Sequence, residues 1–363
     1  MAQANVYASV AGTVGRSDKD PGKVGVFRRG AETGEWQHVI SEHSSNTVFV
    51  HPTNPSLVFA GTHDGVYRST DAGKTFKRAN FPDKGMEIWS FLVDAGNPKL
   101  MYAGGSPTAV YRSEDSGESW KRLPDPHMPS RCVMPFQCRV MRMAQHPKKP
   151  GTIFAALEVG GVMRTTDGGE TWKDCSDSLV QLAKLPHLKS KIASDSFEEG
   201  MLDGHAIAIN PADPDAVIVA VRMGLFRTAD DGNSWQDMEV GRFSPTTYGR
   251  DIQASRAEPG TLYSALSVAA ASKDGAMPAS SCASINKATG AAEAQACSTF
   301  HRRSAHRTTN SGPAGGAAAR CLARASTVLM TPPAGCRAPG RSTAAPGCAR
   351  ATWRHRAPRR QTR

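Results

Sequence analysis

The stretch "GVYRSTDAGKTF" at residues 65–76 decides the fold, because nearly the same pattern occurs three more times in the chain. The other copies are "AVYRSEDSGESW" at 109–120, "GVMRTTDGGETW" at 161–172 and "GLFRTADDGNSW" at 224–235. Each copy has a short apolar run followed by Ser or Thr, Asp, Gly, Ser or Thr and an aromatic residue at fixed offsets. A pattern that recurs at such intervals indicates a repeat fold.

Each repeat has the composition of four short strands. In the first full copy the apolar runs are "TVFVHP", "SLVFAGT", "GVYRS" and "TFKRA", and Pro or Gly turns separate them. Short runs rich in Val, Ile, Phe and Tyr between such turns are typical of strands. Units of four antiparallel strands build a β-propeller, so the sequence predicts an all-β propeller of about six blades with the last one incomplete. We expect the propeller in residues 1–276, with blades near 5–40, 45–80, 87–123, 138–175, 204–238 and 249–276.

The letters of the repeated turn have physical reasons. The Asp carboxylate can accept hydrogen bonds from the backbone of its own turn, and the Gly adopts a positive φ at little cost. The aromatic residue can then pack between adjacent blades. We therefore expect a structural role, not a catalytic one, for Asp71, Gly73, Phe76, Asp115, Gly117, Trp120, Asp167, Gly169, Trp172, Asp230, Gly232 and Trp235.

The repeated turn resembles the Asp-box, also called the bacterial neuraminidase repeat, with the pattern Ser/Thr-x-Asp-x-Gly-x-Thr/Ser-Trp/Phe. The resemblance extends over about residues 24–276, where the copy at 25–39, "GVFRRGAETGEWQHV", keeps the strand and Trp36 but lacks the Asp. Proteins with this repeat include sialidases and other glycoside hydrolases, sortilin-type receptor domains and photosystem assembly factors. The resemblance implies a propeller scaffold, and a scaffold does not determine function.

Residues 277–363 differ in composition from the rest of the chain. They contain fourteen of the 44 Lys and Arg residues and one of the 33 acidic residues, so residues 1–276 have a net charge near −2. This Ala-, Arg-, Gly- and Pro-rich tail has few large apolar residues, which predicts disorder. One interpretation is a basic arm for anionic partners. We favour an out-of-frame translation of a GC-rich gene, because the change falls inside a repeat.

Other features exclude several classes of function. The repeats have no phosphate-binding loop, zinc spacing, nucleophile elbow or basic stripe, so we expect no cofactor, no metal and no nucleic-acid partner for the folded region. Cys132, Cys138 and Cys175 are expected to be free thiols in a reducing compartment. The N-terminus has no pattern typical of a signal peptide, and no apolar run is long enough to span a membrane. We expect a cytoplasmic monomer.

Blade topology predicts where a site lies. The repeated turn joins the third strand to the fourth, so the opposite face contains the start of each innermost strand. Two long insertions, 124–137 and 175–204, belong to that face, and the second is expected to form a helix near 177–185 that ends before Pro186. Insertions on one face of a repeat fold usually mark the binding face. The residues we expect to bind a ligand there are Glu87, Trp89, Arg139, Arg142, His205, Arg250 and Asp251.

Two functions remain open on this face. The first is non-catalytic binding of a glycan, another small molecule or a protein partner. The second is glycoside hydrolysis, which needs two carboxylates flanking a sugar, with Glu87 and Asp251 as the pair. Likeness to sialidases would add an arginine clamp from Arg139, Arg142 and Arg250, a Tyr248 nucleophile and Glu199 as a further acidic partner, but the sialidase signature after "VFRRG" is missing. Alternatively, these residues are solvated or form structural ion pairs, such as Arg250 with Glu87.

Overall fold

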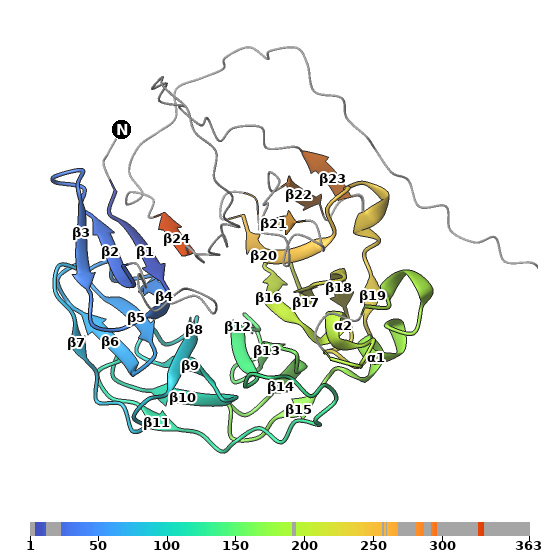
Figure 1. The fold of residues 1–363 in the computed structure, drawn as a ribbon, viewed down its shortest axis with the longest axis horizontal. Helices are drawn as coiled ribbons and strands as arrows, with labels where there is room; N and C mark the ends of the chain where they lie inside the picture. The colour runs from blue at the N-terminus through green and yellow to red at the C-terminus, as the bar shows by residue number, and fades with distance from the viewer. Residues whose placement is uncertain are drawn as a thin grey trace, which may run out of the picture.

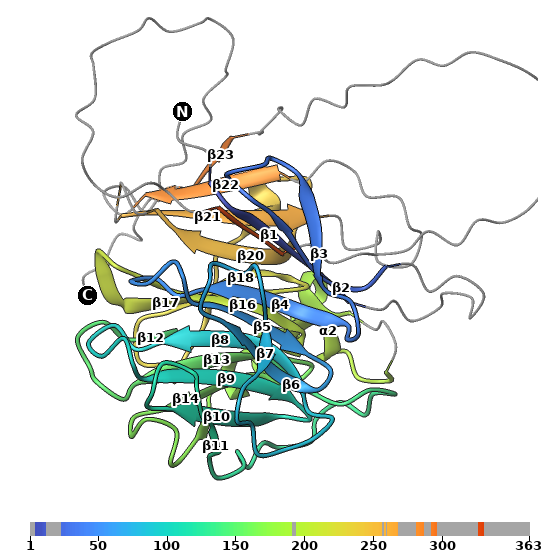
Figure 2. The same ribbon diagram turned by 90° about the vertical axis from the view of Figure 1, so that its left-hand side faces the viewer.

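The computed structural model describes residues 4–11, 23–190, 194–255, 258, 260–267, 281–286, 292–295 and 326–329. These residues form six four-stranded antiparallel sheets that follow one another around an axis (Figures 1 and 2). The protein is thus an all-β propeller, as the repeats predict. The first strand of each of the sheets two to six is innermost, and these strands contact one another in sequence order.

The strands are named in order along the chain. The first sheet contains β24 (Ser326–Leu329), β1 (Val6–Val10), β2 (Gly25–Arg29) and β3 (Trp36–Ile40). The second contains β4 (Ser45–Val50), β5 (Val58–Thr62), β6 (Gly65–Ser69) and β7 (Lys77–Arg78). The third contains β8 (Glu87–Val93), β9 (Met101–Ser106), β10 (Ala109–Ser113) and β11 (Lys121–Arg122). The fourth contains β12 (Arg139–Gln145), β13 (Ile153–Glu158), β14 (Gly161–Thr165) and β15 (Lys173–Asp174). The fifth contains β16 (Gly204–Asn210), β17 (Asp213–Val221), β18 (Gly224–Thr228) and β19 (Gln236–Asp237).

The sixth sheet differs from the expectation of an incomplete last blade. Its strands β20 (Tyr248–Ala254) and β21 (Thr261–Ser267) are followed by β22 (Ser281–Asn286) and β23 (Ala292–Gln295), so the sheet has four strands. Both added strands come from the segment expected to be disordered, as does β24, which pairs with β1 in the first sheet. Backbone pairing does not require large apolar side chains, and this is why composition missed these strands. The rest of 277–363, and with it the prediction of disorder, lies outside the described residues.

The second strands of the second, third and fourth sheets lie in the core. Every residue of β5, β9 and β13 is buried. Both faces of such a strand pack against neighbouring sheets, so the runs are apolar on both sides instead of alternating. Adjacent sheets share their hydrophobic clusters: Phe59 on β5 of the second sheet lies in one cluster with Phe91 on β8 and with Trp120 of the third sheet.

The four repeated turns, Ser69–Phe76, Ser113–Trp120, Thr165–Trp172 and Thr228–Trp235, are here called the Asp turns. In the first, Ser69 Oγ donates to Asp71 Oδ1 at 2.7 Å, and the Thr75 amide and hydroxyl donate to the same carboxylate at 2.9 and 2.6 Å. The same three bonds recur at Asp115, Asp167 and Asp230. Partial burial would raise the pKa of Asp71, but the bonds from Thr75 and Ser69 outweigh it and hold the pKa at about 2. Each carboxylate thus accepts its hydrogen bonds from residues of its own turn and has a structural role there.

In three sheets, an arginine on the third strand donates to the Asp turn of the next sheet. Arg28 Nε on β2 donates to the Ala72 carbonyl, inside the next Asp turn, at 2.9 Å. The equivalent bonds join Arg68 to Ser116 at 3.1 Å and Arg164 to Asp231 at 2.6 Å. The acceptor follows the turn aspartate and has a positive φ in each case. The Asp turn is therefore also a docking element between sheets.

The insertions carry the helices. Helix α1 (Asp177–Leu182) is shorter than predicted, and a 3₁₀ turn at Pro186–Leu188 follows it. Helix α2 (Glu199–Leu202) precedes β16, and a second 3₁₀ turn covers Val240–Arg242. Arg131 of the first insertion forms ion pairs with Asp174 and Asp177, so the two insertions are tied together.

Candidate functional site

A β-bulge occurs at the same place on five inner strands. The ladders between first and second strands shift by one residue near the start of β4, β8, β12, β16 and β20. The residues skipped by the shifts are Asn46, Trp89, Met141, His205 and Arg250. A bulge bends a strand, re-aims its side chains and is over-represented beside active sites. The end of the propeller where the inner strands begin is called the axial face below.

The first polar group on the axial face lies between the third and fourth sheets. Trp89 Nε1 donates to Glu87 Oε2 at 3.1 Å, and His63 Nδ1 lies 3.8 Å from Glu87 Oε1. The Arg139 guanidinium lies 4.4 Å from the centre of the Trp89 ring and donates to Glu158 at 2.5 Å. Cation–π contact and the ion pair fix Arg139 from two sides.

The second polar group lies between the fifth and sixth sheets. His205 Nε2 lies 2.6 Å from the Tyr248 hydroxyl and 3.5 Å from Asp203 Oδ2. Arg222 donates to the same Asp203 oxygen at 2.9 Å. The guanidinium groups of Arg222 and Arg250 lie 4.6 and 3.7 Å from the centre of the Tyr248 ring. This group combines two cations, an imidazole and a buried carboxylate.

Asp203 is the carboxyl of this group, and its pKa is strongly shifted. Its burial alone would raise the pKa, but the charges and hydrogen bonds of His205 and Arg222 outweigh burial and hold the pKa at about 2. The carboxylate is therefore ionised at neutral pH and anchors both neighbours. Tyr248 itself is 1 % exposed, which places its hydroxyl beneath the surface and not in the position of a nucleophile.

An ion pair links the fourth and sixth sheets. Arg142 Nη2 on β12 lies 3.0 Å from Asp251 Oδ1 on β20. The strand β16 lies between these two strands in the order around the axis. Arg142 and Asp251 both directly follow a bulge, so the equivalent positions of two strands meet across the axial face.

Several buried polar atoms on the axial face have no hydrogen-bond partner. They are both side-chain polar atoms of Asn46, Oδ1 of Asp203 and Nε of Arg139. Buried polar atoms are nearly always satisfied in native proteins, by protein groups or by water. Other buried polar atoms without a partner lie away from this face, for example Arg164 Nε and Trp172 Nε1, so these atoms by themselves do not mark a site.

The structure distributes the predicted residues over these groups. Glu87, Trp89 and Arg139 lie in the first group, His205, Tyr248 and Arg250 lie in the second, and Arg142 pairs with Asp251. The proposed carboxylate pair, Glu87 and Asp251, thus has two different sets of partners. Glu199 lies in α2, where its carboxylate accepts from the Ser194 amide and hydroxyl at 2.8 and 2.9 Å.

Sequence reasoning missed two partners, Glu158 and Arg222. Glu158 ends β13, and Arg222 directly follows β17. The antiparallel register brings the end of a second strand beside the start of the first. The charged residues that end "IFAALE" and "AVIVAVR" could therefore have been predicted from the sequence to lie on the axial face.

Among the described residues, no group of three or more His, Cys, Asp and Glu side chains is arranged to hold a metal ion. Within the same part of the chain, no helix combines the length and the apolar character that a membrane crossing requires.

Comparison with known proteins supports the fold. The sortilin-Vps10 family, described as sortilin, neurotensin receptor 3, matches residues 64–189, which is about a third of the chain. An ancestral GH74 enzyme has 14 % identity and a TM-score of 0.51, over 69 % of this chain and 31 % of its own. The GH74 xyloglucanase from Xanthomonas campestris has 17 % identity and a TM-score of 0.51, over 72 % of this chain and 38 % of its own. The chain thus spans about a third of the length of these enzymes. No curated protein matches the sequence at a significant level.

Proposed function

We propose that the protein is a non-catalytic propeller that binds a ligand or a protein segment on its axial face. The observation that carries this proposal is the bulge shared by five inner strands. A bulge interrupts the ladder and is retained where a side chain must be re-aimed. Polar and aromatic side chains recur at or beside these bulges, and a few well-placed polar groups in a concave, rigid frame are typical of binding sites.

The contacts of the proposed carboxylate pair support binding more than hydrolysis. A glycosidase needs two carboxyl groups that flank the sugar, one of which protonates the leaving group. Glu87 accepts from Trp89 Nε1 at 3.1 Å and lies near His63, so its partners differ from those of Asp251. Asp251 is further engaged by Arg142.

The alternative is a glycoside hydrolase that uses carboxylates and arginines of the same face. Its support is that Glu87 and Asp251 both reach solvent, with 32 % and 38 % of their side chains exposed. Likeness to GH74 enzymes at this level of identity supports the scaffold and not the reaction.

The test is a binding screen with paired tryptophan variants. Labelled protein is applied to arrays of peptides and glycans, and each hit is measured with wild type, Trp89→Ala and Trp36→Ala. Trp36 on the outer strand β3 is 54 % exposed and serves as the matched control. We expect Trp89→Ala to lose at least tenfold in affinity, because a buried aromatic anchor carries much of the binding energy, and Trp36→Ala to change little. Equal loss in both variants contradicts the proposal, and so does turnover of any glycan hit that Glu87→Gln abolishes.

A further inference from the structure

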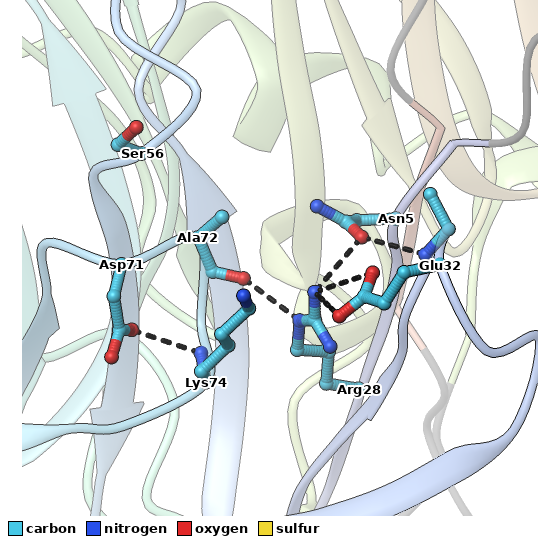
Figure 3. Close-up of a pocket in the computed structure, with 8 residues that line it drawn as sticks. Asn5, Arg28, Glu32, Ser56, Asp71, Ala72 and Lys74 are labelled. Atoms are coloured by element: carbon cyan, nitrogen blue, oxygen red, sulfur yellow. Dashed lines mark hydrogen bonds and ion pairs between the residues drawn. The ribbon is translucent and has the colours of Figure 1, made fainter.

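A hollow lies at the end of the propeller opposite the axial face, between the first and second sheets. It has a volume of about 650 Å³ and opens to solvent. Its lining comes from the Asp turn of the second sheet and from the residues around β1 and β2 (Figure 3). The residues that matter here are Asn5, Arg28, Glu32, Ser56, Ala72 and Lys74.

The hollow lies where the repeat departs from its own pattern. The turn between β2 and β3 has the sequence "RGAETGEW" at 29–36 and lacks the aspartate that closes the Asp turns. Instead, Asn5 Oδ1 accepts from the Ala31 amide at 2.9 Å, and it also accepts from Arg28 Nη2 at 3.1 Å. Asn5 thus supplies the side-chain acceptor in this turn, beside the arginine that the repeats share.

Arg28 is held firmly and is 1 % exposed. Its Nε donates to the Ala72 carbonyl, and its Nη2 donates to both carboxylate oxygens of Glu32 at 2.9 and 3.1 Å. Glu32 itself is 47 % exposed, on the irregular turn. The buried guanidinium needs an anionic partner, and another carboxylate in the place of the exposed Glu32 would keep it paired.

A second cation, the exposed Lys74, lines the hollow beside Arg28. Hydrogen bonds from the backbone and from Arg28 lower the pKa of Glu32, and the charge of Lys74 contributes to the same shift. Arg28 and Lys74 are thus two cationic donors beside one carboxylate, a combination of the kind that recognises an anion.

We propose that this hollow binds the carboxylate of a small acid or of a peptide. The ligand carboxylate takes the place of Glu32 on Arg28 Nη2 and receives a charge-assisted hydrogen bond from Lys74. Glu32 swings into solvent and acts as a built-in competitor. A carboxylate is favoured because the group now on Arg28 is itself a carboxylate, held through both oxygens at one nitrogen.

The test is calorimetric titration with citrate at low ionic strength, on the full chain. Relative to wild type, Glu32→Gln is expected to raise citrate affinity about threefold to fivefold, because the competing charge is removed. Lys74→Gln is expected to lower affinity by a similar factor. Lys121→Gln, an exposed lysine on β11, is the matched control and is expected to leave affinity within twofold.

Two further arms make the outcome decisive. Phosphate at equal concentration tests the anion class, and an acidic peptide with and without a free C-terminal carboxylate tests the source of the group. Citrate affinity that is unchanged in Glu32→Gln and Lys74→Gln overturns the site, as does an equal loss in Lys121→Gln. Equal affinity for phosphate overturns the carboxylate assignment. Trp89→Ala must leave citrate binding intact, so a failure here is separate from a failure of the axial-face proposal.

Discussion

Arg142 and Asp251 form an ion pair with an Nη2–Oδ1 distance of 3.0 Å, although the strand β16 lies between their own strands. Both residues directly follow a bulge on an inner strand. Their side chains are 41 % and 38 % exposed, so solvent screens the attraction. The pair therefore connects two sheets that are not direct neighbours more than it stabilises the fold.

A charge exchange at this pair tests that distinction. Arg142→Glu and Asp251→Arg are each expected to lower the free energy of unfolding by less than about 1 kcal/mol, as for other exposed pairs. Each is expected to weaken ligand binding on the axial face, and the double exchange to restore part of it. Urea unfolding and affinity for an array hit are the two measurements. A large stability loss with unchanged binding would show a structural pair instead.

The Asp turns make stability depend on acid pH. The folded pKa of Asp71 and Asp167 is about 2, below the ordinary value of 3.8, so the unfolded chain takes up protons first. The resulting stabilisation is complete above about pH 4 and is lost as pH falls toward 2. Urea unfolding at pH 7, 4 and 3 should show this decline. Asp71→Asn should reduce its slope, and a slope equal to that of wild type would contradict the assignment.

The docking of Asp turns predicts a strong effect at Gly117. Its φ is +76°, and a Cβ there would lie 2.3 Å from Cε1 of Phe59 in the preceding sheet. Gly85 has a similar φ of +66° with nothing within 4 Å of the added atom. Both Ala variants carry the backbone strain, but Gly117→Ala also overpacks the junction, which costs a further ~1–3 kcal/mol. Chemical denaturation measures the difference, and equal losses would mean that the turn does not dock as described.

The frame-shift hypothesis for 277–363 predicts a property of the gene. The codons after Ala276, translated in the other two frames, should encode further copies of the Ser/Thr-x-Asp-x-Gly pattern. The absence of such copies from both frames would falsify it. In the chain as given, segments of this tail supply β22, β23 and β24.

The sheets were predictable from sequence because the apolar runs of each repeat indicate its strands, and the Asp and Gly residues indicate its turn. The axial face was predictable from topology, since the Asp turn lies at the opposite end of each sheet. The bulges were not predictable from sequence. A bulge places two residues of one strand opposite one residue of the neighbouring strand, and the amino acids around Trp89 or Arg250 do not reveal this. Glu32 was not predicted for another reason. Its turn lacks the aspartate of the repeat, and only the contacts with Arg28 show that Glu32 has a structural partner.

Hydroxyl-radical footprinting with a ligand from the arrays tests the central claim, that the bulged strand starts form the binding site. Trp89 and Met141 are partly exposed there and carry oxidisable side chains, and Trp36 reports on the outer surface. The account predicts that bound ligand protects Trp89 and Met141 from oxidation and leaves Trp36 unchanged. Protection at Trp36, with Trp89 and Met141 oxidised as in the free protein, would contradict it.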